Sequence, residues 1–371
     1  MRGVRVAVVT ESFLPQVNGV TNSVLRVCEH LVARGHEPLV VAPGPGPTEW
    51  SGARVVRSPS LPLPGYPGFR VGRPWPNLVR TLREFRPDVV HLASPAVLGA
   101  QAGRVATRLG VPAVAVYQTD LAAFALRYGW HRTERVVWRW LQTVHESAAR
   151  TLAPSRAAVA DLQRHGISRV RRWVRGVDLQ RFSPAHRDPA LRSELAPDGQ
   201  LLVGYVGRLA PEKQVHLLAA LDGLPGVRLV VAGDGPERAQ LERLVPSAVF
   251  RGFTSGPELS SLFASLDVFV HPGAHETFCQ AAQEALASGV PVVGAAAGGL
   301  LDLVEHGRTG RWFEPGSAAG LRHAVERLTE DPPLRAEMGL AARRSVAGRG
   351  WEVVGDELIG HYRAVLAGRS E

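Results

Sequence analysis

The chain has 371 residues and a hydrophobic content of 45%, which suffices for two globular domains that each bury a core. Its apolar runs stay far below the ~20 residues that a membrane-spanning helix needs, and Met1 leads into a predicted strand without a signal-peptide cleavage region. Cys28 and Cys279 lie far apart and form no disulfide framework, so we expect a cytoplasmic protein.

The charge is distributed unevenly along the chain. Residues 1–183 carry 25 basic and 11 acidic side chains and residues 184–371 carry 18 and 23, so the formal net charge of +9 divides into +14 and −5. Lys213 is the one lysine among the 43 basic residues, which suggests that this position needs a lysine. Only the basic isoelectric point suggests nucleic-acid binding. The sequence contains no nucleic-acid-reading motif, so we expect no nucleic-acid partner.

The first half of the chain alternates predicted strands with predicted helices. Apolar residues 4–10 indicate a central parallel strand, and a tight turn ending at Gly19 leads into a helix that ends at Gly35. Residues 43–67 are rich in proline and glycine and indicate a loop. Further elements are expected as strands at 38–42, 88–92, 113–117 and 151–153 and a helix near 95–109.

Residues 177–199 interrupt this alternation, because several prolines mark a linker there. The second series is expected to contain strands from Leu201 and at 227–232, 248–251, 267–270 and 290–294, with a helix after Pro211. We therefore predict an α/β protein of two tandem Rossmann-like domains, at 1–183 and 184–350, with a ligand in the cleft between them. A C-terminal helix at 351–367 is predicted to pack back on the first domain.

Residues 271–284, with the sequence HPGAHETFCQAAQE, combine a strand end, a Pro-Gly turn and a helix predicted at 277–288. The backbone N–H groups of Phe278, Cys279 and Gln280 would be unpaired donors in the first helical turn. They would lie at the positive end of the helix dipole, where phosphate binds readily.

Two carboxylates bracket this turn. Glu276 and Glu284 are about two helical turns apart, so both can face one ligand. They also fit a simpler interpretation, in which the first favours the helix dipole and the second is solvated. The stretch is not a zinc-protease HExxH motif, because Cys279 replaces the second histidine and His271 and His275 lie on either side of the Pro-Gly turn. The pattern therefore indicates no metal ligands.

Arg208 and Lys213 follow the first predicted strand of the second domain. A guanidinium and an ammonium group beside a phosphate-binding helix start would suit a diphosphate, although ordinary surface charge is the alternative. The Gly-Asp-Gly sequence at 233–235 lacks the remaining glycine of a dinucleotide fingerprint and identifies no site by itself.

Several segments together resemble the retaining glycosyltransferases of family 4, which have the two-domain GT-B fold. They are PQVNGV, GRLAPEK, VVAGDGP, residues 249–252, HETFCQAAQE and ASGVPVVGAAAGG. The resemblance covers nearly the whole chain, and ESFLPQVNGVTNSV is most similar to the actinobacterial GDP-mannose-dependent α-mannosyltransferases. It implies transfer of a hexose, most simply mannose from GDP-mannose, with retention at the anomeric carbon.

The resemblance also implies roles for individual residues. Arg208 and Lys213 would bind the donor diphosphate, Glu284 the ribose hydroxyls, and Glu276 the transferred sugar. These side chains would stabilise the leaving diphosphate as the sugar–oxygen bond breaks. Because the chain contains no D-x-D motif, we expect no metal ion and no other cofactor.

Backbone contacts are implied as well. Gly19 would let the facing domain approach the diphosphate, the N–H groups at 278–280 would meet the sugar and phosphate, and the backbone near Phe253 and Thr254 would meet the base.

One departure concerns the fourth strand of the first domain. Many family members carry a histidine after the aromatic residue there, but Gln118 follows Tyr117 in this chain. The role of that histidine cannot be transferred, and Asp120 is a candidate substitute.

Three other functions are left open. The first is a UDP-sugar-dependent transferase with a soluble acceptor, and the second is a sugar-nucleotide epimerase of similar architecture. The third is a nucleotide-sugar-binding scaffold, which the presence of both carboxylates, Arg208 and Lys213 disfavours. An enzyme that releases nucleotide diphosphate only after an acceptor is added would be a transferase and not an epimerase.

Two segments of the basic half, at 66–86 and 127–140, mix arginine with aromatic residues. Each basic residue near an anionic membrane contributes about 1 kcal/mol, and tryptophan and tyrosine settle at the headgroup level. We therefore expect a peripheral enzyme on the inner face of the plasma membrane with a lipid acceptor, unless these aromatic residues pack in the core. The residues concerned are Phe69, Arg70, Arg73, Trp75, Arg80, Arg83 and Arg86 in the first segment, and Tyr128, Trp130, Arg132, Arg135, Trp138 and Arg139 in the second.

Overall fold

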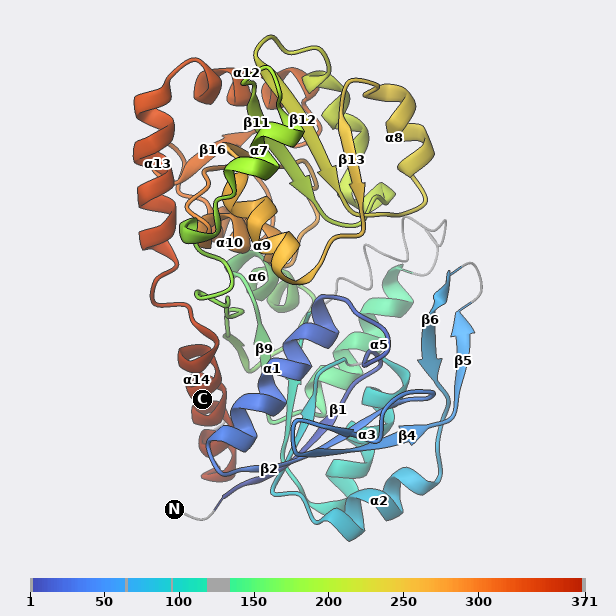
Figure 1. The fold of residues 1–371 in the computed structure, drawn as a ribbon. Helices are drawn as coiled ribbons and strands as arrows, with labels where there is room; N and C mark the ends of the chain where they lie inside the picture. Colours follow the sequence, from blue (N-terminus) through green and yellow to red (C-terminus); the bar gives the residue numbers. More distant parts are fainter. Residues whose placement is uncertain (1–2, 64–65, 95, 119–133, 369–371) are drawn as a thin grey trace. The chain divides into compact units, whose positions relative to one another are not determined.

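The computed structural model describes residues 3–63, 66–94, 96–118 and 134–368 (Figure 1). The chain forms two compact units, the first comprising Met1–Arg175 and Trp351–Glu371 and the second Gly176–Gly350. The boundary predicted at 183 therefore falls within the second unit. The reason is local packing, since Val177 forms a β-bridge with Gly350 and the ring of Phe182 packs edge-on against that of Phe263.

The first unit is built on an eight-stranded sheet with the order β10-β9-β8-β7-β1-β2-β4-β3. Every neighbouring pair is parallel except β3 and β4, which are antiparallel. The strands are β1 (Arg5–Val9), β2 (Glu37–Pro43), β3 (Glu49–Trp50), β4 (Ala53–Ser58), β7 (Val89–Leu92), β8 (Ala113–Val116), β9 (Arg150–Ala153) and β10 (Val170–Arg172).

The prediction of a loop at 43–67 is wrong. It contains β3, β4 and β5 (Ser60–Leu63), and β6 (Tyr66–Gly72) begins within it. β5 and β6 form a separate antiparallel hairpin, and β3 and β4 lie at one edge of the large sheet. Edge strands and hairpins tolerate proline because one side of the strand needs no ladder hydrogen bond. The proline-rich composition therefore did not prevent strand formation.

The two faces of β1 pack in two different hydrophobic clusters, because its apolar residues point alternately to one face and the other. Val6 and Val8 pack in a cluster with α1 (Gly19–Ala33) and α14 (Trp351–Leu366), whereas Ala7 and Val9 pack with α2 (Asn77–Phe85) and α3 (Val97–Leu109) (Figure 1). This follows from the period of two along a strand. Burial of both faces explains why the strand is apolar throughout.

Helices α5 (Glu134–Glu146) and α6 (Arg156–Arg164) also belong to the first unit and share a third buried cluster. In the part of the chain that the structure describes, no helix is both long enough and apolar enough to cross a bilayer.

The second unit has a six-stranded sheet, all parallel, with the order β13-β12-β11-β14-β15-β16. The strands are β11 (Leu201–Val206), β12 (Val227–Ala232), β13 (Val249–Gly252), β14 (Val268–His271), β15 (Val292–Ala295) and β16 (Gly310–Phe313). The α-helices are α7 (Pro189–Leu195), α8 (Arg238–Leu244), α9 (Gly256–Ser265), α10 (Gln280–Ala287), α11 (Leu300–Leu303), α12 (Ala318–Thr329) and α13 (Pro332–Ser345). The helix predicted after Pro211 consists of two 3-10 segments, η3 (Pro211–Lys213) and η4 (Val215–Leu221), and a third, η2 (Pro184–His186), lies in the predicted linker.

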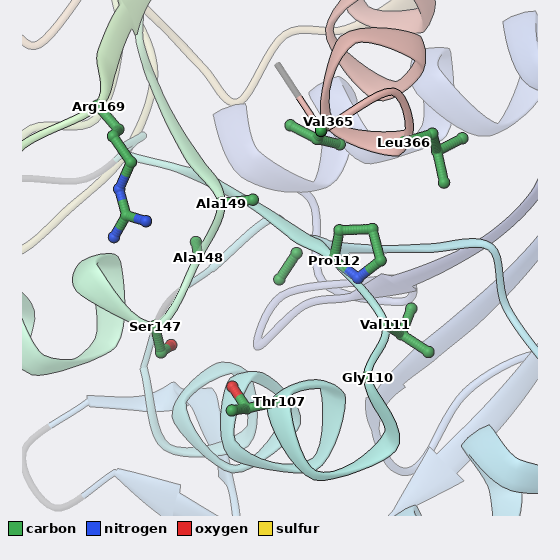
Figure 2. Close-up of a pocket in the computed structure, with 12 residues that line it drawn as sticks. Thr107, Gly110, Val111, Pro112, Ser147, Ala148, Ala149, Arg169, Val365 and Leu366 are labelled. Carbon is green, nitrogen blue, oxygen red and sulfur yellow. The ribbon is translucent and has the colours of Figure 1, made fainter. Parts of the chain in front are cut away.

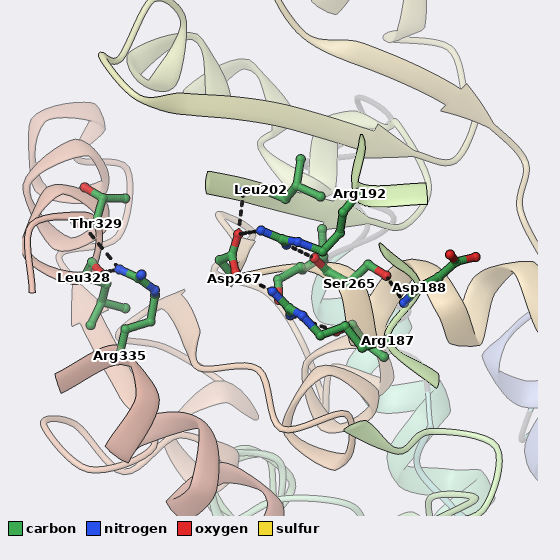
Figure 3. A network of polar contacts seen from close by, with 11 residues as sticks. Arg187, Asp188, Arg192, Leu202, Ser265, Asp267, Leu328, Thr329 and Arg335 are labelled. Atoms are coloured by element: carbon green, nitrogen blue, oxygen red, sulfur yellow. Dashed lines mark hydrogen bonds and ion pairs between the residues drawn. The ribbon is translucent and has the colours of Figure 1, made fainter. Parts of the chain in front are cut away.

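Asp267 anchors the predicted linker to the second unit (Figure 3). Its side chain is 10% exposed and accepts hydrogen bonds from Arg187 and Arg192, at 3.1 and 3.0 Å, and from the backbone N–H of Leu202 at 2.8 Å. A buried carboxylate needs such partners to offset its desolvation. The linker is therefore an ordered part of this unit that includes α7.

Both sheets contain a point where the strand order reverses. In the second unit β11 pairs with β12 on one side and β14 on the other, and in the first unit β1 pairs with β2 and β7. Connections leave such neighbouring strands in opposite directions, so a crevice forms outside their carboxyl ends, where open α/β sheets bind ligands. The loops after β11 and β14 and the loops after β1 and β7 are therefore the places to look for a site.

Candidate active site

Lys213, His271 and Glu276 meet at the switch point of the second unit. Lys213 lies in the 3-10 turn after β11, His271 is the last residue of β14, and Glu276 follows in the next loop. Lys213 Nζ lies 2.5 Å from Glu276 Oε1, and His271 Nε2 lies 2.8 Å from the same oxygen. Gly273 permits this approach, because a Cβ there would lie 3.2 Å from the Cα of Lys213.

Glu276 is ionised in this arrangement. Burial raises the pKa of its carboxyl group, but Lys213 and His271 outweigh burial and hold that pKa well below its usual range. The ion pair is largely shielded from solvent, with 24% of the Lys213 side chain and 13% of the Glu276 side chain exposed. Fixed charges in such a place interact more strongly than they would in water.

The helix predicted at 277–288 begins later than expected, at Gln280. Cys279 precedes it with φ 77°, a left-handed conformation that cannot continue the helix toward the N-terminus. The N–H groups of Phe278 and Cys279 thus belong to the loop before α10, and Gln280 is the first of the three predicted donors inside the helix. Glu276 also lies outside α10, so the argument that placed it two helical turns from Glu284 is wrong, although Glu284 is on the helix.

The loop before α10 is held by the Gly-Gly pair that precedes α11. The N–H of Gly299 donates to the carbonyl of Glu276 at 2.7 Å. A Cβ on Gly298 would lie 2.4 Å from that carbonyl oxygen, and a Cβ on Gly299 would lie 2.4 Å from the Cα of Phe278. The glycines of the GAAAGG sequence therefore permit a backbone contact that side chains would prevent.

The other donor-site residues predicted in the second unit lie on the same edge of the sheet or on α10. Arg208 follows β11 and its guanidinium contacts Glu212, a partner that the sequence analysis missed. Phe253 follows β13 and is 73% exposed, and the hydroxyl of Thr254 donates to the carbonyl of Gly252 at 3.3 Å. The structure thus joins Lys213 to Glu276 directly, whereas Arg208 is paired with its own neighbour.

His271, Glu276 and Cys279 each offer a potential metal-ligand atom, and these atoms lie within 4.8 Å of one another. The sequence pattern did not indicate this trio, because it depends on a loop conformation and not on helical spacing. Lys213 occupies the same carboxylate oxygen, and its positive charge opposes a cation. Burial raises the pKa of the Cys279 thiol well above its usual value, and Glu276 adds to the shift, so the thiol is protonated. The group therefore fits an ion pair better than a metal centre.

The first unit carries a polar cluster at its own switch point. Gly19 is the exposed first residue of α1, and the side chain of Asn18 caps that helix by accepting from two backbone N–H groups. Gln118, just after β8, donates to the carbonyl of Ala93 at 3.1 Å and accepts from Arg175. Arg175 was missed by the sequence analysis, since a single arginine in an arginine-rich chain carries no signal. Asp120, the predicted substitute for the family histidine, lies outside the described residues.

Comparison with known proteins gives matches along most of the chain. A Glycosyltransferase Family 4 model matches residues 17–181, and a Glycosyl transferases group 1 model matches residues 187–345. The chain is 52% identical to a GDP-mannose-dependent alpha-mannosyltransferase of Mycobacterium tuberculosis, with 100% of this chain and 99% of that protein covered. It is 46% identical to a protein of the same name from Corynebacterium glutamicum, with 99% and 90% covered. The chain belongs to the family 4 glycosyltransferases.

Solved structures support the fold of this glycosyltransferase. Sucrose-phosphate synthase from Thermosynechococcus elongatus superposes with a TM-score of 0.79 over 98% of this chain and 100% of that one, at 21% identity. The predicted family and the predicted GT-B arrangement of two Rossmann-like halves are therefore confirmed.

The surface of the glycosyltransferase that was expected to face a membrane is only partly present. Trp138 is 8% exposed and stacks on His165 with 3.6 Å between ring centroids, so it packs in the core. Trp75 is half-buried against the α2–α3 cluster, and Arg70 donates to the carbonyl of Gly44 at 3.0 Å. These three residues are therefore unavailable to lipid. The exposed arginines of the two segments are Arg73, Arg80, Arg83, Arg86, Arg135 and Arg139. Outside the described residues lie Tyr128, Trp130 and Arg132, and also the side chain of Phe69.

A hollow of about 470 Å³ lies elsewhere in the first unit of the glycosyltransferase (Figure 2). It is lined by the starts of β8 and β9 and the end of α14, among others Pro112, Ala149 and Val365. These are the amino ends of the strands, opposite to the edge where α/β sheets bind ligands. Its charged residue, Arg169, is already bonded to the carbonyl and carboxylate of Glu146. The hollow therefore differs from the donor site in its position on the sheet and in its lining.

Proposed function

We propose that this enzyme is a retaining α-mannosyltransferase that moves mannose from GDP-mannose to a lipid-linked or glycolipid acceptor at the inner face of the plasma membrane. Two observations support the proposal. Relatives 46–52% identical over nearly their whole length carry the name GDP-mannose-dependent alpha-mannosyltransferase. The Lys213–Glu276 ion pair lies at the switch point beside the start of α10, and it would supply a cation for the diphosphate and a carboxylate for the sugar.

The donor would bind with its diphosphate against Lys213, Arg208 and the start of α10. When the bond between the anomeric carbon and the phosphate oxygen breaks, negative charge grows on the diphosphate. An ammonium group already held in place stabilises that charge without reorganising at the moment of reaction. We propose that Arg208 leaves Glu212 to join it, and that these groups replace a metal ion.

The acceptor hydroxyl would then bond to the anomeric carbon on the face that the diphosphate leaves, and its proton would pass to a phosphate oxygen. Glu276 would hold the transferred sugar through its hydroxyls, and its ionised carboxylate is a strong acceptor for them. Glu284 would accept from the ribose hydroxyls. The backbone near Phe253 and Thr254 would meet the base, and the role that the resemblance implies for Gly19 stays a prediction.

The membrane contact would rest on α2 and the residues around it. Arg80 and Arg83 are exposed on α2, Arg86 is exposed at its C-terminal end, and Arg73 is exposed shortly before the helix. Four such residues give useful attachment at about 1 kcal/mol each near an anionic surface. Without Trp138 and Trp75, this attachment would be mainly electrostatic and therefore sensitive to salt.

One experiment tests the proposed function directly. The purified protein is incubated with labelled GDP-mannose, UDP-glucose or UDP-galactose in the presence of a total lipid extract or of soluble sugars, and the products are separated. We expect label from GDP-mannose to enter the lipid fraction, with GDP released only when lipid is present. Label from a UDP-sugar in a soluble product, or interconversion of the sugar nucleotide without an acceptor, would contradict the proposal.

A further inference from the structure

His271 is a buried histidine beside Glu276, at the end of β14. Only 2% of it is exposed. Its ring lies nearly parallel to those of Tyr205 and Phe269, with 5.9 and 6.5 Å between ring centroids. A Cβ on Gly273 would lie 3.2 Å from Nε2 of the ring, so the glycine keeps this nitrogen clear of a side chain. The ring is therefore fixed by its packing.

One of the two ring nitrogens of His271 makes a hydrogen bond. Nε2 lies 2.8 Å from Oε1 of Glu276, and because an ionised carboxylate only accepts, Nε2 is the donor. Nδ1 is buried and has no partner in the part of the chain that the structure describes. Nε2 is therefore the atom through which His271 acts on the site.

Two donors from different segments meet on the same oxygen of Glu276. Lys213 Nζ lies 2.5 Å from Oε1, which also accepts from His271. The backbone of Glu276 is held as well, because its carbonyl accepts from the N–H of Gly299 at 2.7 Å. The other carboxylate oxygen, Oε2, accepts from none of the described residues, and 13% of the side chain is exposed. Oε2 is therefore the oxygen left for a ligand.

Lys213 and His271 differ in how firmly they hold Oε1. The lysine reaches it through a flexible four-carbon stem, and its ammonium group has three N–H donors, of which Glu276 needs one. The others remain for a diphosphate. The histidine offers a single N–H from a ring that packing fixes. The rotation of the Glu276 carboxyl group therefore depends on His271.

We propose that His271 is a positioning residue, which holds Oε1 of Glu276 and so directs Oε2 toward a hydroxyl group of the transferred sugar. The identity of the sugar rests on the proposed function. Orientation of this kind matters for transfer, because a misplacement of about 1 Å can cost about 10²-fold in rate. GDP has no transferred sugar, so its affinity depends little on His271.

Substitutions at His271 separate the donor atom from the packing of the ring. His271→Phe keeps an aromatic ring beside Tyr205 and Phe269 and removes the N–H. Glutamine carries an amide nitrogen as many bonds from the backbone as Nε2, and asparagine carries one as many bonds away as Nδ1. His91→Phe is the matched control, because His91 is 1% exposed and loses one hydrogen bond, between Nδ1 and Oη of Tyr362 at 2.6 Å, in the other unit. Unfolding temperatures establish that each variant is folded.

Calorimetric titration with GDP and transfer of labelled mannose from GDP-mannose are measured for each variant. His271→Phe lowers kcat/KM for GDP-mannose about tenfold or more, as expected for a lost hydrogen bond to a charged group, and changes the Kd for GDP less than about threefold. His271→Gln recovers part of the loss and His271→Asn does not. His91→Phe leaves both quantities close to wild type.

Glu276→Gln tests whether His271 acts through Glu276. The amide oxygen can accept in the place of Oε1, so the amide nitrogen takes the place of Oε2 and offers the sugar a donor instead of an acceptor. Adding His271→Phe to Glu276→Gln therefore lowers kcat/KM no further. Losses that multiply in the double variant would overturn the inference, as would wild-type transfer by His271→Phe or an equal loss of GDP affinity and transfer. If His271→Phe does not fold, equal transfer by His271→Gln and His271→Asn would overturn it.

Failure of the wild-type protein to use GDP-mannose would instead contradict the proposed function. If the wild type transfers a sugar from a UDP-sugar, the same variants are compared with that donor and with UDP. If it transfers no sugar, the urea midpoints of His271→Phe, Glu276→Gln and the double variant test the contact. A shift in the double variant smaller than the sum of the single shifts supports the hold of His271 on Glu276, and additive shifts would refute it.

Discussion

Replacement of Lys213 by methionine removes the positive charge from the Lys213–Glu276 pair and keeps most of the side-chain volume. Lys213 Nζ lies 2.5 Å from Glu276 Oε1, and 13% of the Glu276 side chain is exposed, so the carboxylate would lose its strongest partner in a nearly buried place. Removing one member of a buried pair costs about 3–5 kcal/mol when the remaining charge is uncompensated. His271 remains 2.8 Å from the same oxygen. We therefore expect a smaller loss, about 1–3 kcal/mol of unfolding free energy.

This loss should depend on pH in a defined direction. In the wild type, burial raises the pKa of Glu276, but Lys213 and His271 lower it below its ordinary value of 4.5. A depressed pKa gives stability that is present above the unfolded-state pKa and is lost as the pH falls through the folded-state pKa. The difference in unfolding free energy between wild type and Lys213→Met should therefore be largest near neutral pH and should become smaller below about pH 4.5.

The same substitution should reduce turnover by about 10²-fold or more, as does the loss of a preorganised donor in other enzymes. Urea unfolding at several pH values and mannose transfer at saturating GDP-mannose measure the two effects. Arg308→Met is a matched control, because Arg308 pairs with Glu305 at 2.6 Å with 70% and 52% of the two side chains exposed. It should change stability by less than about 1 kcal/mol. Turnover close to wild type in Lys213→Met, or a stability change no larger than that of the control, would refute the reasoning.

Three further predictions concern the donor, the metal and the membrane. Glu284→Ala should weaken GDP binding in calorimetric titration, whereas Glu276→Gln should slow transfer more than it weakens GDP binding; an equal loss of GDP affinity in both would contradict the division of roles. Transfer activity should persist in excess EDTA, because fixed cationic side chains are proposed to stabilise the diphosphate, and recovery on adding Mg²⁺ or Mn²⁺ to an inactive chelated enzyme would disprove this. The protein should co-sediment with vesicles containing phosphatidylglycerol and not with pure phosphatidylcholine vesicles, and replacement of Arg80, Arg83 and Arg86 by serine should reduce binding; indifference to lipid charge would favour a soluble acceptor.

The sequence by itself determined the order and type of the central elements. The apolar run at 4–10 was recognised because a strand buried on both faces must be apolar throughout, and β1 occupies Arg5–Val9. The strand predicted at 227–232 corresponds to β12, and the final helix predicted at 351–367 corresponds to α14 (Trp351–Leu366). Lys213 was identified from composition alone, since one lysine among 43 basic residues is unusual in itself.

Only the tertiary structure decided the details of the site, because they depend on contacts between segments distant in sequence. α10 begins at Gln280 and not at residue 277, since the preceding loop takes its shape against Gly298 and Gly299. His271 shares an oxygen of Glu276 with Lys213 because β11 and β14 are neighbours, and no local pattern states which parallel strands pair. Arg175 looks like any other arginine in the sequence, and only the burial of its guanidinium between Gln118 and Gly19 distinguishes it.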